Sequence, residues 1–287
     1  MGRKLDLPLS SISDALLESI MRSVANYTVG FLRIDKGQRG KDLTLLGSGT
    51  LITCNGIHAI LTAHHVVEVL PTRGELGLVY SQRLTHATFL TEGLRYIKIA
   101  RGSENSEGPD LGAVILPPNI VSMLSATKSF HNLDRNRTQL LTQPPAILDG
   151  LWIVQGFIAK LTAEEFDFEH RIKTVSFFEL SSSGMVSREY CIGVHDYFDY
   201  PMKFLRETQP RDYGGTSGGG LWQVRLQQKG PDGEIEPVTV PILSGVAFYQ
   251  QAIESDRSLL KCHGRRSVYE VAYNAISEGA AATKRQS

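Results

Sequence analysis

Hydrophobic residues recur at two spacings, which divide the chain into a helical start, a β-rich middle and a helical end. Residues 11–26 carry apolar side chains at the three- and four-residue intervals of an amphipathic helix, and Ser11–Asp14 offers an N-cap. The apolar positions there are Leu16, Leu17, Ile20, Met21 and Val24. Residues 267–277 repeat the pattern with Val268, Val271, Ala272, Ala275 and Ile276. We therefore predict one helix near each end.

Between these helices the hydrophobic residues form short runs bounded by Gly, Pro, Asn and Asp, which is typical of β-strands. The predicted strands are residues 29–34, 43–53, 58–62, 76–80, 96–100, 111–116, 152–157, 174–180, 221–226 and 238–249. This spacing favours an antiparallel barrel or sandwich over repeated βαβ units.

Residues 117–150 are rich in Ser, Asn, Arg and Pro and separate the two sets of strands, which predicts a crossover between two lobes. The expected organisation is an N-terminal helix and extension (1–27), a first lobe (28–120), a crossover (121–149), a second lobe (150–255) and a C-terminal helix and tail (256–287). A length of 287 residues is sufficient for two lobes.

Charge and hydropathy exclude several classes of partner. The 30 Lys and Arg residues balance 30 Asp and Glu residues, so the chain lacks the field that attracts nucleic acid or an anionic membrane. No apolar run approaches the roughly 18 residues that span a bilayer. We expect neither a nucleic-acid nor a membrane partner.

Cysteine usage and the first residues indicate the compartment. Cys54, Cys191 and Cys262 are odd in number and lack Cys-x-x-Cys spacing, which predicts reduced, mostly buried thiols. The basic start is followed by no continuous apolar stretch or small-residue cleavage site, so no signal peptide is expected. The expected location is cytoplasmic.

Candidate chemistry comes from three segments. Residues 61–66 (LTAHHV) end a predicted strand with two histidines, residues 109–116 (PDLGAVIL) place Asp110 before an apolar strand, and residues 214–222 (GGTSGGGLW) hold Ser217 among glycines. A serine hydroxyl is a weak nucleophile that needs a neighbouring base, usually histidine. A carboxylate must hold that histidine in one tautomer and orientation.

The glycines around Ser217 also suggest an oxyanion hole. They would let the backbone turn so that the N–H groups of Gly215 and Ser217 point into one concavity. Such a pair stabilises the oxyanion of acyl transfer, and each donor contributes about a hundred- to a thousandfold in rate.

These segments resemble the His, Asp and Ser motifs of chymotrypsin-like (trypsin-type) serine proteases. The order is that family's, with 45 residues from His65 to Asp110 and 107 from Asp110 to Ser217. Three further stretches are similar to the strand before the histidine, the start of the second barrel and the pocket strand: residues 47–52 (GSGTLI), 154–157 (VQGF) and 243–248 (LSGVAF). The resemblance covers residues 28–250 and implies an all-β fold of two antiparallel β-barrels, with short N- and C-terminal helices.

The resemblance also implies residue roles. Ser217 would be the nucleophile, His65 the general base and acid, and Asp110 the residue that orients His65, while Gly215 and Ser217 would form the oxyanion hole. The implied activity is a serine endopeptidase that acts on a protein or peptide substrate through an acyl-enzyme, with no metal and no cofactor. Activity should be optimal at or above neutral pH, because His65 must be unprotonated to act as a base.

His64 competes for the role of base because it is adjacent to His65. The family motif places its histidine directly before a small or apolar residue, and His65 precedes Val66, which favours His65. Strand-like alternation would send the two side chains to opposite sides, so only one of them can serve.

Two departures separate the chain from vertebrate digestive members of that family. Thr216 stands where those members carry the Asp that pairs with a freed N-terminus, and Val66 replaces a common half-cystine. Both changes make the chain similar to bacterial HtrA-like and other intracellular trypsin-like peptidases. Unlike HtrA proteins, it is not expected to carry a PDZ domain after residue 250.

The substrate pocket is predicted less sharply. Residues 209–213 should form one wall, where an inward Asp212 would favour a basic P1 residue and an inward Arg211 an acidic one. Alternatively both charges face solvent, and a small apolar pocket lies near Phe248.

Two other functions remain open. Residues 215–219 also satisfy the G-x-S-x-G motif of α/β-hydrolase esterases, with Asp256 and His263 as triad partners, although three glycines after Ser217 make a poor helix start. The second is a trypsin-fold protein that is latent, or acts as a binding module, until a protein activator completes the site.

The remaining histidines, His263 among them, are predicted to be ordinary surface or core residues. The stretch 64–68 lacks the spacing of a metal site. The aromatic segment 195–200 is expected to be a loop on the second lobe.

Overall fold

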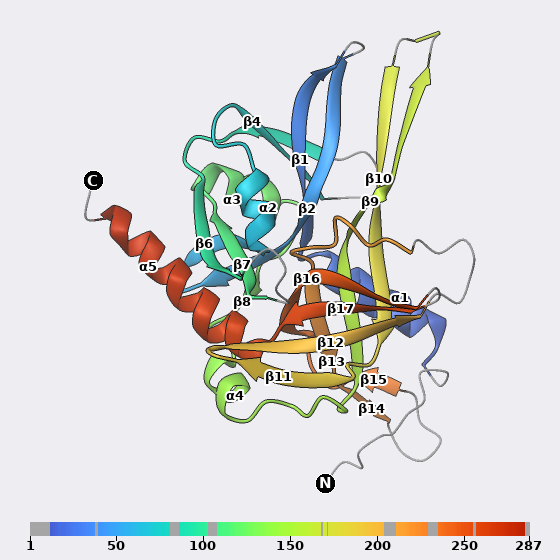
Figure 1. Cartoon of the computed structure of the whole chain (residues 1–287), viewed down its shortest axis with the longest axis vertical. Coiled ribbons are helices and arrows are strands. Elements are labelled where there is room, and N and C mark those ends of the chain that lie inside the picture. The colour runs from blue at the N-terminus through green and yellow to red at the C-terminus, as the bar shows by residue number, and fades with distance from the viewer. Residues whose placement is uncertain are drawn as a thin grey trace.

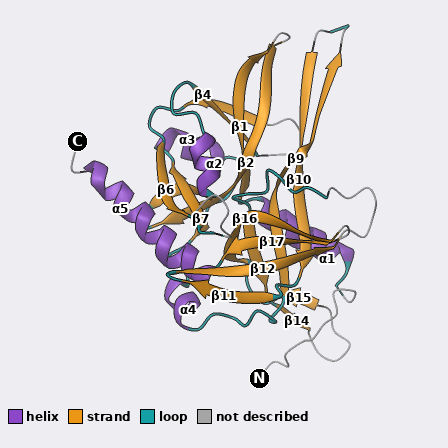
Figure 2. Cartoon of the chain, viewed as in Figure 1, coloured by secondary structure: helices purple, strands orange, loops and turns teal. Residues whose placement is uncertain are grey.

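A computed structural model describes residues 12–37, 40–80, 86–102, 108–167, 169–170, 172–203, 211–228, 235–254 and 257–284. Strands dominate these residues, in two large and mainly antiparallel sheets with a few short helices (Figures 1 and 2). The prediction of a mostly β protein with antiparallel sheets and short helices near the ends is confirmed.

The first sheet contains the strands that precede residue 116. Its order is β5 (His86–Leu90), β4 (Glu75–Val79), β1 (Thr28–Gly37), β2 (Gly40–Cys54), β3 (Ile57–Thr62), β7 (Asp110–Ile115) and β6 (Arg95–Arg101). The short strand β8 (His131–Asn132) pairs with β2 in parallel.

The second sheet is built from the strands that follow residue 150. Its order is β10 (Ile172–Gly184), β9 (Leu151–Asp167), β13 (Gly220–Val224), β16 (Ile242–Glu254), β17 (Arg257–His263), β12 (His195–Lys203) and β11 (Arg188–Ile192). Strands β14 (Leu226–Gln228) and β15 (Ile235–Pro237) form a separate pair. In the described ranges neither large sheet closes on itself, because β5 and β6, like β10 and β11, remain separate edges.

Helices lie at both ends, after β3 and in the crossover: α1 (Asp14–Ala25), α2 (His64–Val69), α3 (Pro118–Ser125), α4 (Arg137–Thr142), a π-helical turn η2 (Ser267–Ala272) and α5 (Tyr273–Lys284). The predicted N-cap region is used, since the Ser13 side chain accepts a hydrogen bond from Leu16 N–H at 3.3 Å. Within the described residues, no helix combines the length and apolar character needed to cross a membrane.

One hydrophobic core spans both sheets. Leu111 and Ala113 of β7 share a buried cluster with Trp222 of β13 and Val246 of β16. Ile276 of α5 joins the same cluster, so the C-terminal helix covers its outer side (Figure 1). The end of β3 and the start of β7 are thereby brought against the start of β13.

Two segments differ from expectation, and a third decides against an alternative. Residues 195–200 belong to strand β12 rather than to a loop, and residues 257–263, expected in the C-terminal helix and tail, form β17 of the second sheet. These two strands pair with each other. The segment after Ser217 leads into strand β13 and not a helix, which removes the structural premise of the α/β-hydrolase alternative. Asp256 lies outside the described residues.

Candidate active site

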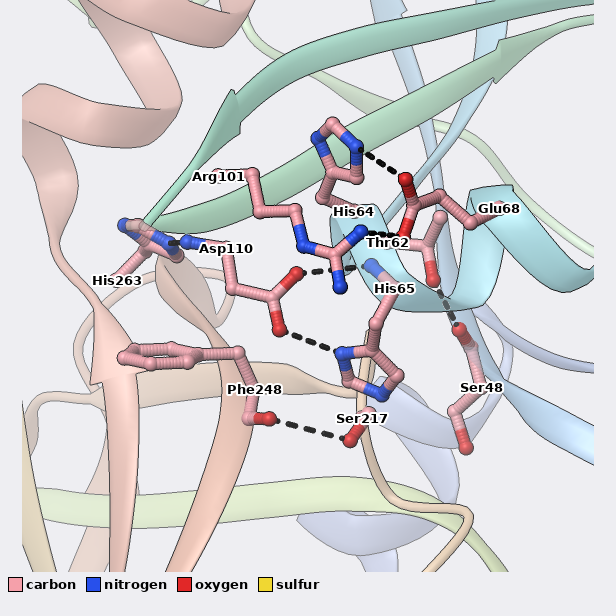
Figure 3. Close-up of polar contacts among 10 residues, drawn as sticks. All are labelled: Ser48, Thr62, His64, His65, Glu68, Arg101, Asp110, Ser217, Phe248 and His263. Atoms are coloured by element: carbon pink, nitrogen blue, oxygen red, sulfur yellow. Dashed lines mark hydrogen bonds and ion pairs between the residues drawn. The ribbon is translucent and has the colours of Figure 1, made fainter. Parts of the chain in front are cut away.

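His65 and Asp110 meet at the ends of neighbouring strands. Asp110 opens β7, and His65 lies in the first turn of α2, directly after β3, which pairs with β7. His65 Nδ1 lies 2.5 Å from Asp110 Oδ2, and the His65 backbone N–H donates to Oδ1 at 2.9 Å (Figure 3). The carboxylate is therefore held at both oxygens by one residue.

The electrostatics of this pair fix the imidazole tautomer. Burial raises the pKa of Asp110, but the hydrogen bonds and charge of His65 outweigh that effect and hold the pKa below its usual value. An ionised carboxylate only accepts hydrogen bonds, so the shared proton lies on His65 Nδ1. In the neutral ring Nε2 then carries a free lone pair, on a side chain that is 45% exposed.

His64 points away from this pair and binds another carboxylate. Its Nε2 lies 3.4 Å from Glu68 Oε1, and Arg101 also contacts Glu68. Desolvation raises the pKa of Glu68, but Arg101 and the other nearby cations outweigh it and leave the pKa lowered. The side chains of the two histidines point in different directions, as we expected, but strand alternation is not the reason. Both residues lie in helix α2, where successive side chains point to different sides.

Ser217 lies beside the Nε2 edge of the His65 ring (Figure 3). Its hydroxyl donates to the carbonyl oxygen of Phe248 at 3.3 Å. The described structure contains no hydrogen bond between Ser217 and His65. The three residues expected to act together are thus assembled from both sheets, with the serine hydroxyl turned toward β16. Hydrogen bonds of this kind are often loose without substrate.

The backbone around Ser217 leaves two amides unused. Four N–H groups find acceptors: Gly214 at Asp212 Oδ1 (2.8 Å), Thr216 at Tyr213 O (3.0 Å), Gly218 at Ala247 O (2.7 Å) and Gly219 at Thr216 O (2.7 Å). Within the described residues the N–H groups of Gly215 and Ser217 have none. Both residues are half-buried, so these two donors on either side of Thr216 are open to an acceptor from outside the loop.

Neighbouring carbonyls set the direction of these two donors. Gly214 O accepts from Ala159 N–H at 2.8 Å, and Thr216 O accepts from Gly219 N–H. Because N–H and C=O point in opposite directions in a trans peptide, Gly215 N–H is aimed away from β9. Ser217 N–H is likewise aimed away from Gly219. Gly215 adopts φ +95°, a conformation that favours glycine.

Ser48, which sequence reasoning did not single out as a site residue, locks this loop from the first sheet. Its hydroxyl accepts from Phe157 N–H at 2.8 Å and donates to Gly215 O at 2.6 Å. Its own N–H donates to Ser217 O at 2.8 Å. The approach is so close that a Cβ on Gly218 would lie 2.0 Å from Ser48 O. The signal in the sequence was the Gly-Ser-Gly pattern of residues 47–49.

The predicted pocket residues have clear positions. Asp212 is exposed and its Oδ1 accepts from Gly214 N–H, so it shapes its own loop. Gln250 braces that loop, because its amide donates to Arg211 O and accepts from Tyr213 N–H, each at 2.8 Å. The Phe248 ring is only 4% exposed and packs inward. Residues 209 and 210 lie outside the described residues, and the P1 preference remains a prediction.

His263, which we predicted to be an ordinary core or surface residue, lies next to Asp110 on the inner side of the His65–Asp110 pair. Its Nε2 accepts from Asp110 N–H at 3.0 Å, and its ring is fully buried (Figure 3). No sequence pattern could reveal this contact, since 153 residues separate the two.

Other potential sites do not coincide with these residues. A cavity of about 640 Å³ lies between the crossover and the start of β16, lined among others by Tyr27, Arg135 and Arg225, and none of the predicted catalytic residues lines it. Among the described residues, no three His, Cys, Asp or Glu side chains are grouped so that they could hold a metal ion.

Comparisons with known proteins add little. No protein-family model matches the sequence, and no curated protein sequence matches it. Among solved structures 157 chains match. One is described as "Aromatic interactions drive the coupled folding and binding of the intrinsically disordered Sesbania mosaic virus VPg protein"; it is 14% identical, covers 86% of this chain and 90% of that chain, and has a TM-score of 0.42. A superposition of this quality assigns neither a fold family nor a function.

Proposed function

We propose that this protein is a serine endopeptidase, similar to the chymotrypsin-like (trypsin-type) proteases, that cleaves protein or peptide substrates. One observation carries the proposal: a carboxylate-bound histidine lies beside Ser217, whose own backbone N–H and that of Gly215 are unpaired within the described residues. That combination supplies a base, a nucleophile and an oxyanion site in a single place.

The proposed reaction follows from the positions of these groups. The Ser217 hydroxyl turns from Phe248 O toward His65 Nε2, transfers its proton there and attacks the scissile carbonyl carbon. The carbonyl oxygen becomes an oxyanion that accepts from Gly215 and Ser217 N–H. The imidazolium, stabilised by Asp110, then protonates the leaving amine. Water attacks the acyl-enzyme in the reverse sense, with His65 again as the base, and releases the acid.

The finer fold belongs to the same proposal. We propose that the two sheets represent the two β-barrel lobes of the chymotrypsin-like fold, supported by the origin of His65 and Asp110 in one sheet and Ser217 in the other. The cytoplasmic location stays a prediction from the sequence.

The decisive experiment is labelling with a fluorophosphonate probe, which reacts with an activated serine. We expect the wild type to be labelled and Ser217→Ala and His65→Ala to lose labelling. His64→Gln is the matched control, because it changes the adjacent histidine, which binds Glu68 and not Asp110. A general base must be unprotonated, so labelling should be faster at neutral than at acidic pH.

Two results would contradict this reading. If His64→Gln abolishes labelling while His65→Ala retains it, the base is assigned to the wrong histidine. An optimum centred near pH 5 would exclude His65 as the base. Far-UV circular dichroism of each variant separates loss of chemistry from loss of fold.

A latent protease is the second candidate, and the Ser217 hydroxyl favours it. That hydroxyl is engaged with Phe248 O and makes no hydrogen bond to His65 in the described structure. A latent enzyme would be folded yet unlabelled, and would become labelled when a protein activator or a bound peptide turns the serine. Rapid labelling of the isolated wild type would reject latency.

A further inference from the structure

His263 joins the two halves of the candidate active site from inside the protein. It is the last residue of β17 in the second sheet, whereas Asp110 is the first residue of β7 in the first sheet. The Asp110 N–H donates to His263 Nε2 at 3.0 Å. The carboxylate that holds His65 is therefore tied by its own backbone to the sheet that carries Ser217.

The His263 ring is packed between aromatic side chains in this position. It lies 4.7 Å from the Phe248 ring and 5.2 Å from the Tyr197 ring, measured between centroids. Tyr197 and Val246 are its cross-strand partners on either side. Phe248 is the residue whose carbonyl holds the Ser217 hydroxyl. One ring thus contacts the element under Ser217 and the backbone of Asp110.

The protonation state of His263 suits an acceptor. Burial, with a further contribution from His195, lowers the pKa of His263 to about 3 against the opposing effect of Asp110. The ring is therefore neutral wherever His65 could act as a base. Because Nε2 accepts, its single proton lies on Nδ1, and the acceptor is permanent.

We propose that His263 is a positioning residue that holds Asp110, and through it the His65 ring, in register with Ser217 across the two sheets. This inference rests on the proposed function. Its physical basis is that small displacements of catalytic groups are costly: a shift of about 1 Å can reduce a rate roughly a hundredfold.

The test separates the hydrogen bond from the packing. In His263→Phe a ring still fills the space but nothing accepts from Asp110 N–H. In His263→Gln the side-chain oxygen can reach the position of Nε2, whereas in His263→Asn it is too short. We expect the fluorophosphonate labelling rate to fall about 10- to 100-fold in the Phe and Asn variants and to recover largely in Gln.

A matched control is His131→Phe. His131 is also an aromatic-packed histidine, with contacts to Tyr27 and Trp222 and a hydrogen bond to Tyr269, all outside the triad. It should label at the wild-type rate. The proposal is wrong if His263→Phe labels like the wild type, or if Gln and Asn are equally slow. Should His263→Phe not fold, the comparison of Gln with Asn decides.

A second readout does not depend on serine reactivity. The proton between His65 Nδ1 and Asp110 should give a far-downfield proton NMR resonance, because that hydrogen bond is short and charge-assisted. We expect it to broaden or shift upfield in His263→Phe and Asn and to persist in Gln. If the wild type is unlabelled yet shows this pattern, the proposal of a constitutively active protease fails while the role of His263 stands. An unchanged resonance in all variants overturns the positioning role.

Discussion

A single hydroxyl, that of Ser48, holds both sides of the proposed oxyanion loop. It satisfies Phe157 N–H and Gly215 O at the same time, while the Ser48 backbone binds Ser217 O. The residue is fully buried, so no solvent can replace these bonds. These bonds fix the Gly215–Thr216 and Ser217–Gly218 peptides, which adjoin the two peptides that carry the unpaired N–H groups.

Replacing Ser48 by alanine should affect stability and reactivity together. The Phe157 N–H would be left buried without an acceptor, which costs about 1–3 kcal/mol in the free energy of unfolding. The freed Gly215 peptide should also slow fluorophosphonate labelling of Ser217. Urea denaturation and the labelling rate measure the two effects.

The control for this prediction is Ser122→Ala. That hydroxyl lies exposed on α3 and donates to Pro118 O at 2.9 Å, so its loss should change stability by less than about 0.5 kcal/mol. A Ser48→Ala protein as stable as Ser122→Ala would show that the buried bonds contribute nothing.

At the scale of elements, Asp196 fastens the C-terminal helix to the second sheet. Its Oδ1 accepts from Ser267 N–H at 2.7 Å and its Oδ2 from Arg266 N–H at 2.8 Å. The Ser267 hydroxyl returns a bond to Asp196 O at 3.0 Å. Strand β12 therefore caps the first turn of the segment that continues into α5.

Asp196→Ala should loosen this end of the protein. Two amide donors lose their acceptor, and because Ser267 is buried we expect a loss of about 1–3 kcal/mol in the free energy of unfolding, with reduced helical signal. Asp196→Asn should lose less, since one oxygen remains. Asp14→Asn, at an exposed first-turn acid of α1, is the control, and equal effects in Asp14→Asn and Asp196→Ala would contradict the capping role.

Elements with a strong local pattern were predictable, and those set by distant partners were not. Strand β7 is a continuous apolar run that is buried from Leu111 to Ile115, and it was expected nearly residue for residue. Strand β17 contains the polar residues Lys261 and His263, which are buried where β17 pairs with β12 and β16. Nothing in the local sequence indicates that these two residues are buried. The C-terminal helix ends at Lys284, beyond the predicted residue 277. The added turns contain helix-favouring alanines but no apolar stripe, so the hydrophobic pattern did not predict them.

The same distinction applies to the candidate site. His65, Asp110 and Ser217 lie in motifs whose residue types indicate a nucleophile with its base, and these residues lie close together in the structure. Ser48 and His263 act through contacts across the two sheets that depend on packing. The Gly-Ser-Gly pattern of residues 47–49 marks Ser48 but not its partners, and nothing local marks His263.

At the scale of the whole molecule, buried neutral histidines make stability depend on pH. Burial lowers the pKa of His263 from 6.5 to about 3 and that of His131 to about 4. Below pH 6.5 these two histidines bind protons in the unfolded chain but stay neutral in the folded protein. Stability must therefore rise with pH across this window and fall on acidification, by about 1.4 kcal/mol per pH unit for each histidine.

This dependence can be assigned to single residues by urea denaturation at pH 7.5, 6.0 and 5.0. His263→Gln and His131→Phe should each flatten the slope of unfolding free energy against pH by about one proton. Burial raises the pKa of Glu179, so its titration lowers the free energy of unfolding as pH rises. Glu179 is present in all three proteins, so this contribution cancels in the comparison. Asp110 does not interfere, since its lowered pKa moves its titration to more acidic pH. If both variants keep the wild-type slope, these histidines bind protons as readily in the folded protein as in the unfolded chain, and burial does not keep His263 neutral.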